Sequence, residues 1–410
     1  MTGWIPQTRN LQNGDVSDRI IDFLLGAPIM LKLFGGQQNP SDRKKWKYFQ
    51  EHATLVALGL VAVCAGWLFW RLITPRMDFY NELWGPAYLL VHGKSPYDTA
   101  ALNPVLPAAW FPVAIGFFFP LGWLTELTAS RVWFVFNILE LCGIIYLAQG
   151  EKRSPLGVFA LSLFCFFYPP VLNHLYLGQI SITVAFCLVL AAYFAGKNYR
   201  WREALVVALA FSKPHLAILP VLGLVYYEYK RGGQGAVVSF VGKTFMVAII
   251  LSIPLFVAHP NWIPDAIASM AKNPFWLYPS LFVLYQRFFE GWQYVLWGIT
   301  LMLILGAGWI VWNKFSVEKA MAWSLALAPL ASPYVGSWDF VFSLPLFFQV
   351  FIETDWKRKV FLACSYVLAW YGMALVQIQP SSDNHFFWWV PLWFAATIAL
   401  SSNWHARLKE

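Results

Sequence analysis

The chain has 410 residues, of which 59% are hydrophobic and only 12% are charged. Soluble domains carry roughly 25% charged residues, so this composition excludes an ordinary soluble enzyme and predicts a protein that crosses the membrane many times. The net charge of +8 does not indicate nucleic-acid binding, because the basic residues gather in short runs between apolar stretches. Such runs are typical of the cytoplasmic loops of membrane proteins.

Residues 1–52 are expected to form a cytoplasmic N-terminal segment. They contain no short apolar core with a small-residue cleavage site, so we expect no signal peptide. Within them, residues 15–34 place apolar side chains at helical spacing, which favours a helix lying on the cytoplasmic leaflet. A disordered lead-in is the alternative. The segment is also a candidate for binding a protein partner.

Residues 53–403 are expected to form one all-α polytopic bundle of about 10–12 transmembrane helices, followed by a cytoplasmic tail at 404–410. The apolar stretches are 55–73, 131–148, 156–167, 177–195, 204–227, 237–257, 294–312, 320–330, 340–351, 360–375 and 386–400. Several are shorter than the roughly 20 residues that a simple crossing needs, so we expect tilted or broken helices. The segments 75–107, 168–179, 259–292, 331–339 and 377–385 are then the loops on the outer side.

Residues 110–124 fit two arrangements. They contain Pro112 and Pro120, which favours a re-entrant segment buried in protein. The alternative is a full crossing that places Lys152 and Arg153 outside.

The first outer segment, residues 75–107, contains the most unusual carboxylates of the chain. Asp78 and Glu82 are four residues apart, so on a helix they share one face. The pattern predicts an amphipathic helix at the membrane surface, interrupted at Gly85-Pro86, with a carboxylate placed to take a proton from a hydroxyl. A solvated acidic face is the alternative, above all for Glu82.

Further motifs follow Asp78-Phe-Tyr in order along the chain. They are Leu90-Val-His-Gly93-Lys-Ser-Pro96-Tyr97-Asp98, Leu177-Gly178-Gln179-Ile-Ser, Phe211-Ser-Lys213-Pro214-His215, and Ser332-Pro333 before Trp338-Asp339. Over roughly residues 55–350, their order and spacing resemble glycosyltransferase family 87, whose members include polyprenol-phosphate-mannose-dependent alpha-mannosyltransferases. The chain departs from the family pattern at Phe340, where histidine is frequent, and at Trp110-Phe111-Pro112, where Tyr-Pro-Pro is common.

The resemblance implies a C-type glycosyltransferase fold in the cell membrane, with its active site at the extracytoplasmic surface. The donor would be a hexose, mannose by analogy, on a polyprenyl phosphate, and the acceptor a lipid or a glycan. Asp78 would be the general base. A positioned base contributes roughly 10² to 10⁴-fold to such a reaction, and a phosphate leaving group needs no general acid. No carboxylate or cysteine pattern indicates a metal site, so we expect metal-independent chemistry without a cofactor.

Four basic side chains are candidates for binding the donor phosphate. Lys213 lies inside the predicted span 204–227, where an ionisable residue is a functional candidate. The others are His174, His215 and Arg287. The alternatives are a lysine that snorkels to the interface, histidines with satisfied structural roles, and a structural pair between Arg287 and Glu290.

Candidates for contacts with the sugar or the acceptor are Glu82, Tyr97, Gln179 and Asp339. Gln179 follows Gly178 at the outer start of a span and offers an uncharged donor and acceptor; its alternative role is in helix packing. Aromatic residues of the outer segment 259–292 are candidates for stacking on a sugar ring, although interfacial belts also use such residues. They are Trp262, Phe275, Trp276 and Tyr278.

Two other functions are compatible with the sequence. A carrier for a lipid or a small solute would explain Lys213, Pro214 and the broken spans, but we find no internal repeat of the kind on which many transporters are built. A structural membrane subunit without activity would explain the departures from the family pattern.

Overall fold

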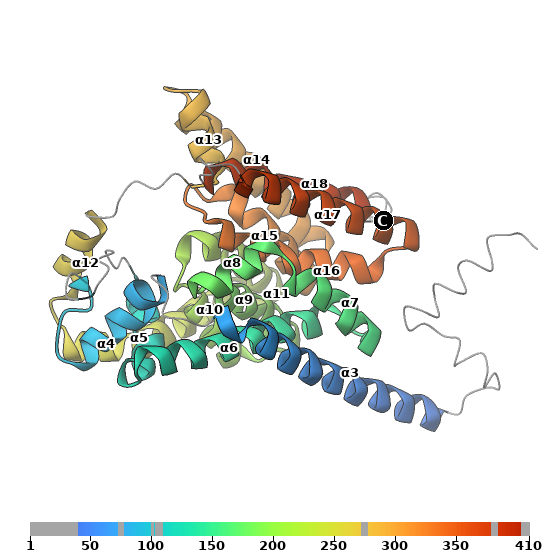
Figure 1. Ribbon diagram of the computed structural model, residues 1–410, viewed down its shortest axis with the longest axis horizontal. Helices are drawn as coiled ribbons and strands as arrows, with labels where there is room; N and C mark the ends of the chain where they lie inside the picture. The colour runs from blue at the N-terminus through green and yellow to red at the C-terminus, as the bar shows by residue number, and fades with distance from the viewer. Residues whose placement is uncertain are drawn as a thin grey trace, which may run out of the picture.

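The computed structural model describes residues 40–72, 78–99, 102, 110–271, 278–378 and 384–402 (Figure 1). The regular structure in these residues is helical throughout, which confirms the predicted all-α fold class. The expected helix at 15–34, the tail at 404–410, and Phe275 and Trp276 lie outside the described residues.

The described residues form short and long helices. In chain order they are α3 (Pro40–Phe69), η1 (Trp70–Leu72), η2 (Phe79–Trp84), α4 (Gly85–Val91), α5 (Pro112–Phe118), η4 (Phe119–Trp123), α6 (Glu126–Ala148), α7 (Pro155–Phe166), α8 (Pro169–Leu177), α9 (Ser181–Lys197), α10 (Arg200–Ala210), α11 (Pro214–Ala258), α12 (Trp262–Ala271), α13 (Leu281–Phe288), α14 (Gln293–Lys314), α15 (Val317–Ala331), η5 (Ser337–Ser343), α16 (Leu344–Glu353), α17 (Trp356–Ile378), η6 (Asn384–Phe387) and α18 (Trp389–Ser401).

Fewer helices are long enough to cross a membrane than the ten to twelve expected. Among the described residues five helices pass by length and composition, namely α3, α6, α11, α14 and α17. A sixth would be the pair α7 and α8, which is bent by 68°. The segments 112–123, 181–197 and 389–401 are apolar but shorter. The difference arises because proline and glycine break several of the apolar stretches into pieces.

The predicted span 204–227 is divided between two helices. α10 ends at Ala210 and α11 begins at Pro214, so Lys213 lies at a helix break instead of inside a helix. Proline fits at the first position of a helix because its missing N–H would have no intrahelical partner there. α11 itself contains a second break, since Gly232 and Gly233 have non-helical backbone angles between the predicted spans 204–227 and 237–257.

Two further segments differ from their predictions. Residues 168–179, expected to be an outer loop, contain helix α8. The expected interruption at Gly85-Pro86 is a change of helix type: η2 ends at Trp84 and α4 begins at Gly85, but the backbone stays helical across the join. Gly85 permits this join: its N–H donates to the carbonyl of Tyr80, and a Cβ there would lie 2.3 Å from that carbonyl oxygen.

Residues 110–124 form only α5 and η4. A helix of 12 residues spans about 18 Å, short of the roughly 30 Å hydrocarbon core, so these elements do not make a straight full crossing. This length fits the re-entrant interpretation. α5 packs against α11, and the carbonyl of Leu251 lies where a Cβ on Gly116 would be.

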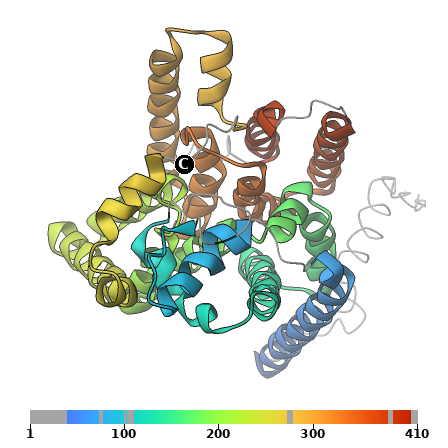
Figure 2. The same ribbon diagram turned by 60° about the vertical axis from the view of Figure 1, so that its left-hand side comes forward.

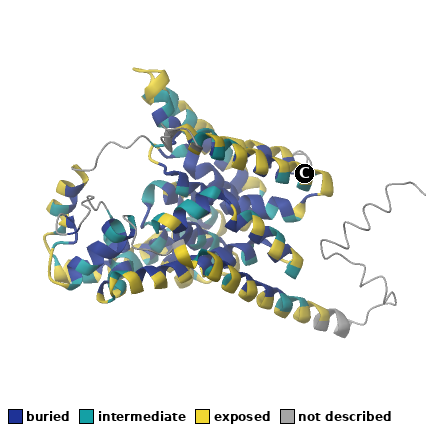
Figure 3. Cartoon of the chain, in the orientation of Figure 1, coloured by how far each residue is buried: buried dark blue, intermediate teal, exposed yellow. Residues whose placement is uncertain are grey.

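The buried core lies around α9 and α15, which contact each other. Their buried residues include Ile182, Leu188, Ala320 and Leu325, each without measurable exposure. Figure 3 shows this dark blue centre, with exposed residues along α3 and on α13 and α14 at the periphery. The outer faces of α3 and α14 are apolar, as a lipid-facing surface requires, with Val63, Trp67, Met302 and Leu303 exposed.

The first outer segment is tied to the region after α11. The Ser95 hydroxyl donates to Asp265 Oδ2 at 2.6 Å, and His259 Nε2 lies 2.8 Å from the same oxygen. α4 and α12 therefore lie together at one end of the molecule, away from α13 (Figures 1 and 2).

Gly116→Ala should lower the thermal stability of the purified protein, because its Cβ would lie 1.7 Å from the Leu251 oxygen. Overpacking of this kind costs roughly 1 to 3 kcal/mol. Gly242→Ala is the matched control, since Gly242 lies on α11, the helix that contains Leu251, and nothing lies within 4 Å of its Cβ position. The measurement is the melting temperature of each variant in detergent, followed by tryptophan fluorescence. Equal melting temperatures for the two variants would contradict the close packing of α5 on α11.

Candidate active site

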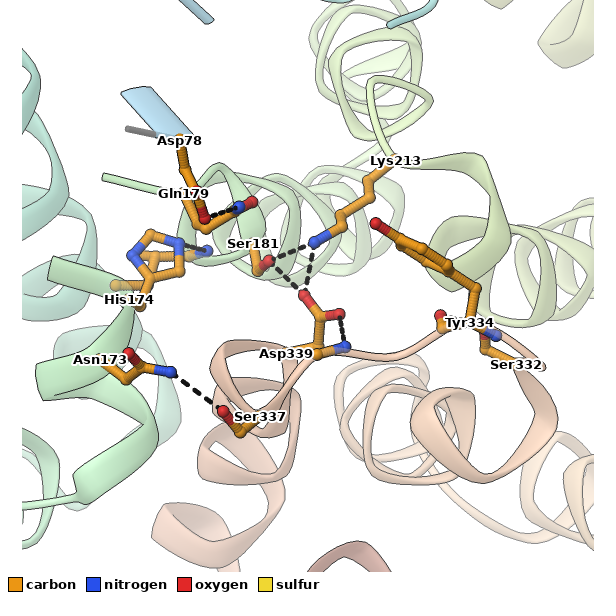
Figure 4. Close-up of polar contacts among 12 residues, drawn as sticks. Asp78, Asn173, His174, Gln179, Ser181, Lys213, Ser332, Tyr334, Ser337 and Asp339 are labelled. Carbon is orange, nitrogen blue, oxygen red and sulfur yellow. Dashed lines mark hydrogen bonds and ion pairs between the residues drawn. The ribbon is translucent and has the colours of Figure 1, made fainter. Parts of the chain in front are cut away.

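Four segments that lie far apart in the sequence meet in one polar centre (Figure 4). Asp78 comes from the start of η2, Gln179 from the turn between α8 and α9, and Ser181 is the first residue of α9. Lys213 comes from the break between α10 and α11, and Asp339 from η5. Sequence reasoning named four of these five residues as candidates.

A buried ion pair forms one half of the centre. Lys213 Nζ lies 2.6 Å from Asp339 Oδ1, and the two side chains are 3% and 0% exposed. Ser181 is shared between them, because its hydroxyl donates to Asp339 Oδ1 at 2.5 Å and accepts from Lys213 Nζ at 3.0 Å. The other Asp339 oxygen accepts the N–H of Gly336 at 2.8 Å. Each charge is thus compensated by a partner, as burial requires.

The helix break explains why Lys213 points inward. Ser212 and Lys213 close the end of α10 through backbone hydrogen bonds, and the carbonyl of Lys213 accepts from Leu216 and Ala217 at the start of α11. The side chain therefore leaves the backbone between two helices and reaches the core. The alternative in which Lys213 snorkels to an interface is wrong.

Gln179 forms the other half of the centre by linking two carboxyl groups. Its Nε2 donates to Asp78 Oδ2 at 2.8 Å and lies 3.5 Å from Glu82 Oε2. Gln179 itself is 3% exposed. Glu82 is half-buried and is directed toward this amide, so the interpretation of Glu82 as part of a solvated acidic face is wrong.

Gly178 places the Gln179 side chain. It ends α8 in the left-handed region at φ 73°, which glycine adopts without strain. A Cβ on it would lie 2.8 Å from the Cβ of Phe79, the residue after Asp78. Trp133 Nε1 donates to the Gly178 carbonyl at 3.0 Å and fixes the turn from the other side.

The electrostatics of the two carboxyl groups are set by burial and by their proximity. Burial raises the pKa of Asp78, partly offset by the hydrogen bond from Gln179 and by the charge of Lys213. Burial, with repulsion from Asp78, raises the pKa of Glu82 to about 8. Two carboxyl groups that share one site shift each other's pKa in this way, because like charges disfavour the second ionisation.

The two histidine candidates have different surroundings. His174 is fully buried, and its Nε2 accepts the N–H of Ile182 at 3.0 Å, so the ring caps the start of α9. This contact agrees with the structural alternative. The His215 ring packs edge-on against Tyr334 with centroids 5.1 Å apart, and its Nε2 has no hydrogen-bond partner among the described residues.

Two candidates lie in other places. Arg287 is at the end of α13, where its guanidinium lies 5.8 Å from the ring centroid of Phe386, and α13 is far from α4 in both Figures 1 and 2. The Tyr97 hydroxyl donates to the carbonyl of Trp110 at 3.1 Å, in a small apolar cluster with Leu90 and Ile115. Neither is part of the polar centre described above.

Sequence reasoning missed Ser181 and Tyr334 as site residues. Ser181 ends the motif Leu177-Gly178-Gln179-Ile-Ser, which could have marked it. Tyr334 packs on Tyr278 with centroids 4.1 Å apart. Burial raises the pKa of both hydroxyls, that of Tyr278 to about 12, and the nearby carboxyl groups of Glu82 and Asp339 contribute to both shifts. The two rings therefore face the polar centre; the sequence analysis named Tyr278 as a candidate for stacking on a sugar but did not name Tyr334.

No candidate metal site can be named within the described residues, because no three His, Cys, Asp or Glu side chains converge there.

The polar centre thus combines a half-buried carboxylate, a bridging amide and a buried ion pair inside an all-helical membrane protein. The sequence model of glycosyltransferase family 87 matches residues 111–333, more than half of the chain. The chain belongs to this family and is a membrane glycosyltransferase. A search of curated proteins finds no match. The family match includes Gln179 and Lys213 but begins after Asp78 and ends before Asp339.

Gly178→Ala should reduce activity because it strains the backbone and meets Phe79. Gly150→Ala separates these two effects, since Gly150 also has a positive φ, of 54°, but has nothing within 4 Å. We expect a loss of sugar transfer at least tenfold greater for Gly178→Ala, corresponding to roughly 1.4 kcal/mol. Equal losses in a transfer assay would mean that the Phe79 contact does not position Gln179.

Asp339→Asn should destabilise the protein by about 3 to 5 kcal/mol, because it leaves the buried Lys213 without its counter-ion. The double variant Lys213→Met with Asp339→Asn should recover part of this loss. Unfolding of wild type, both single variants and the double variant in detergent forms the cycle that measures the coupling. Additive effects would show that the ion pair does not stabilise the fold.

Proposed function

We propose that the protein transfers a hexose, mannose by analogy with the family, from a polyprenyl-phosphate donor to a lipid or glycan acceptor at the extracytoplasmic face. Asp78 is the general base. The observation that carries the proposal is the Asp78 carboxylate, held by Gln179 next to Lys213 at the break between α10 and α11. The side of the membrane follows from the basic runs, which we assign to the cytoplasm together with the N-terminus.

The reaction needs one proton acceptor. The acceptor hydroxyl loses its proton to Asp78 while its oxygen forms a bond to the anomeric carbon of the sugar. The bond from that carbon to the phosphate oxygen breaks, and the phosphate leaves with the electron pair. The raised pKa of Asp78 makes it a stronger base than an exposed aspartate while it remains ionised.

Lys213 is the side chain best placed for the donor phosphate. Its ammonium group has three N–H donors, of which two are directed to Ser181 and Asp339. The third N–H is available for a phosphate oxygen in the described structure. His215, whose Nε2 has no hydrogen-bond partner there, is two residues further along the chain. His174 and Arg287 remain weaker candidates, because their described contacts are with α9 and with aromatic rings.

Sugar and acceptor contacts are assigned to the groups around the same centre. Gln179 and Glu82 offer hydrogen bonds, and the faces of Tyr278 and Tyr334 offer stacking surfaces for a sugar ring. Asp339 acts through Lys213 in this proposal. Tyr97 supports the first outer segment through its bond to Trp110.

A lipid or solute carrier is the second function to test. The break at Lys213 and the bent pair α7 and α8 are features that carriers also use. Movement of a lipid across proteoliposomes without formation of a glycoside would favour it. Constant co-purification with a larger complex and no turnover would instead favour a structural subunit.

Asp78→Asn should lower transfer by at least 100-fold, because the amide cannot accept the proton. The control is Asp98→Asn, an exposed aspartate of the same outer segment. The assay uses labelled synthetic polyprenyl-phosphate mannose and membrane lipids as acceptors, with protein in nanodiscs. Wild-type turnover by Asp78→Asn would remove Asp78 as the base.

The pH dependence provides an independent check. Because burial raises the pKa of Asp78 above its ordinary value of 3.8, activity should fall on acidification at a higher pH than for an exposed aspartate. Initial rates between pH 4 and pH 7 at saturating donor measure this limb. Full activity at pH 4 would contradict the assignment.

A further inference from the structure

The proposed donor is an anion, yet the centre contains more carboxyl groups than cations. Among the described residues, Asp78, Glu82 and Asp339 lie around one ammonium group, that of Lys213, and Asp339 already neutralises it. If all three carboxyl groups were ionised, the centre would carry two uncompensated negative charges. A phosphodiester would then have to approach like charges in a site with little water, where such repulsion is strong.

The geometry shows which carboxyl group can hold a proton. Asp339 accepts hydrogen bonds from Ser181, Lys213 and Gly336, so its ionised form is well solvated by the protein. Asp78 accepts the short bond from Gln179. Within the part of the chain that the structure describes, Glu82 accepts only the longer 3.5 Å contact from the same amide nitrogen, so its ionised form has the fewest hydrogen-bond donors of the three.

We propose that Glu82 holds the proton of a carboxyl pair with Asp78, arranged by the Gln179 amide, and that this proton admits the anionic donor to the site. Glu82 is thus a positioning residue that acts through the charge of the centre, while Asp78 remains ionised as the base. The inference rests on the proposed function, because it takes the donor to be a lipid phosphodiester.

The other groups around Glu82 agree with this assignment. Burial is the main influence on its pKa, followed by repulsion from Asp78, and Lys213 offsets only part of both. Tyr278 and Tyr334 face it as neutral phenols. η2 also packs against α4, α5, η4 and α6. Of these elements, α5 and η4 have no ionisable side chain, and α4 has only Tyr88. On α6, the guanidinium of Arg131 lies over the ring of Trp70, and the carboxyl group of Glu140 accepts a hydrogen bond from Thr183. The remaining ionisable residues of α6 are Glu126, Cys142 and Tyr146.

For the wild type, the apparent KM for the donor should depend on pH by a defined factor. With a pKa of about 8, the protonated fraction of Glu82 falls by about tenfold between pH 7 and pH 9, and the apparent KM for the donor should rise by the same factor. The maximal rate should follow a different pH dependence, because Asp78 stays ionised over this range.

The experiment compares donor KM at pH 7 and pH 9 within each variant, using synthetic polyprenyl-phosphate mannose and protein in nanodiscs. Glu82→Gln cannot ionise, so its ratio of KM values should be close to one whatever its turnover at pH 7. Glu82→Asp can ionise and should retain a rise. A flat wild-type ratio, or the wild-type rise in Glu82→Gln, would overturn the proposal.

A second readout does not depend on activity and so separates this inference from the proposed function. The infrared difference spectrum between wild type and Glu82→Gln, recorded without substrate, isolates the carbonyl band of the protonated Glu82 carboxyl from those of other acids. The band should disappear with a midpoint near pH 8. Its absence at pH 7 would refute the proton assignment, whereas failure of every sugar donor with the band present would refute only the proposed function.

Discussion

The buried ion pair between Lys213 and Asp339 is the contact on which the rest of the centre depends. It joins the break between α10 and α11 to η5, and through Ser181 it also holds the start of α9. Gln179 is two residues before Ser181, so the same contact determines where the bridging amide lies. Because either charge alone would be costly in the core, the three segments are stable only when they are assembled together.

The charge balance of the centre explains why such an arrangement suits catalysis more than stability. Carboxyl groups whose pKa values are raised by burial reduce the stability of the fold as pH rises through neutrality, since the unfolded chain would release their protons more readily. A protein selected only for stability would replace Asp78 or Glu82 with a neutral side chain. Their presence in a half-buried pair therefore agrees with a functional role, as strained or electrostatically unfavourable groups often do.

Much of the fold and part of the centre could be predicted from local sequence. Composition identifies the all-α membrane class. The sequence motifs identify Asp78, Gln179 and Lys213 as candidates, and these three residues lie in one polar centre in the structure. The pairing of Lys213 with Asp339 could not be predicted, because apolar periodicity has no information on contacts across 126 residues. The span 204–227 was misjudged because a hydrophobic run does not show whether Pro214 kinks one helix or begins another. Tyr97 and Arg287 belong to outer segments whose packing is decided by tertiary contacts.

The distance in sequence between Lys213 and Asp339 also has a consequence for biosynthesis. At about 5 to 20 residues per second, a ribosome that has added Lys213 adds the next 126 residues, up to and including Asp339, in roughly 6 to 25 s. During that interval the growing chain carries a lysine whose counter-ion does not yet exist, and a lone ammonium group is unfavourable in lipid. The break at residues 211–213 must then stay in contact with water, or with the insertion machinery, until η5 with Asp339 has been synthesised. The polar centre is therefore assembled late in the biosynthesis of the protein.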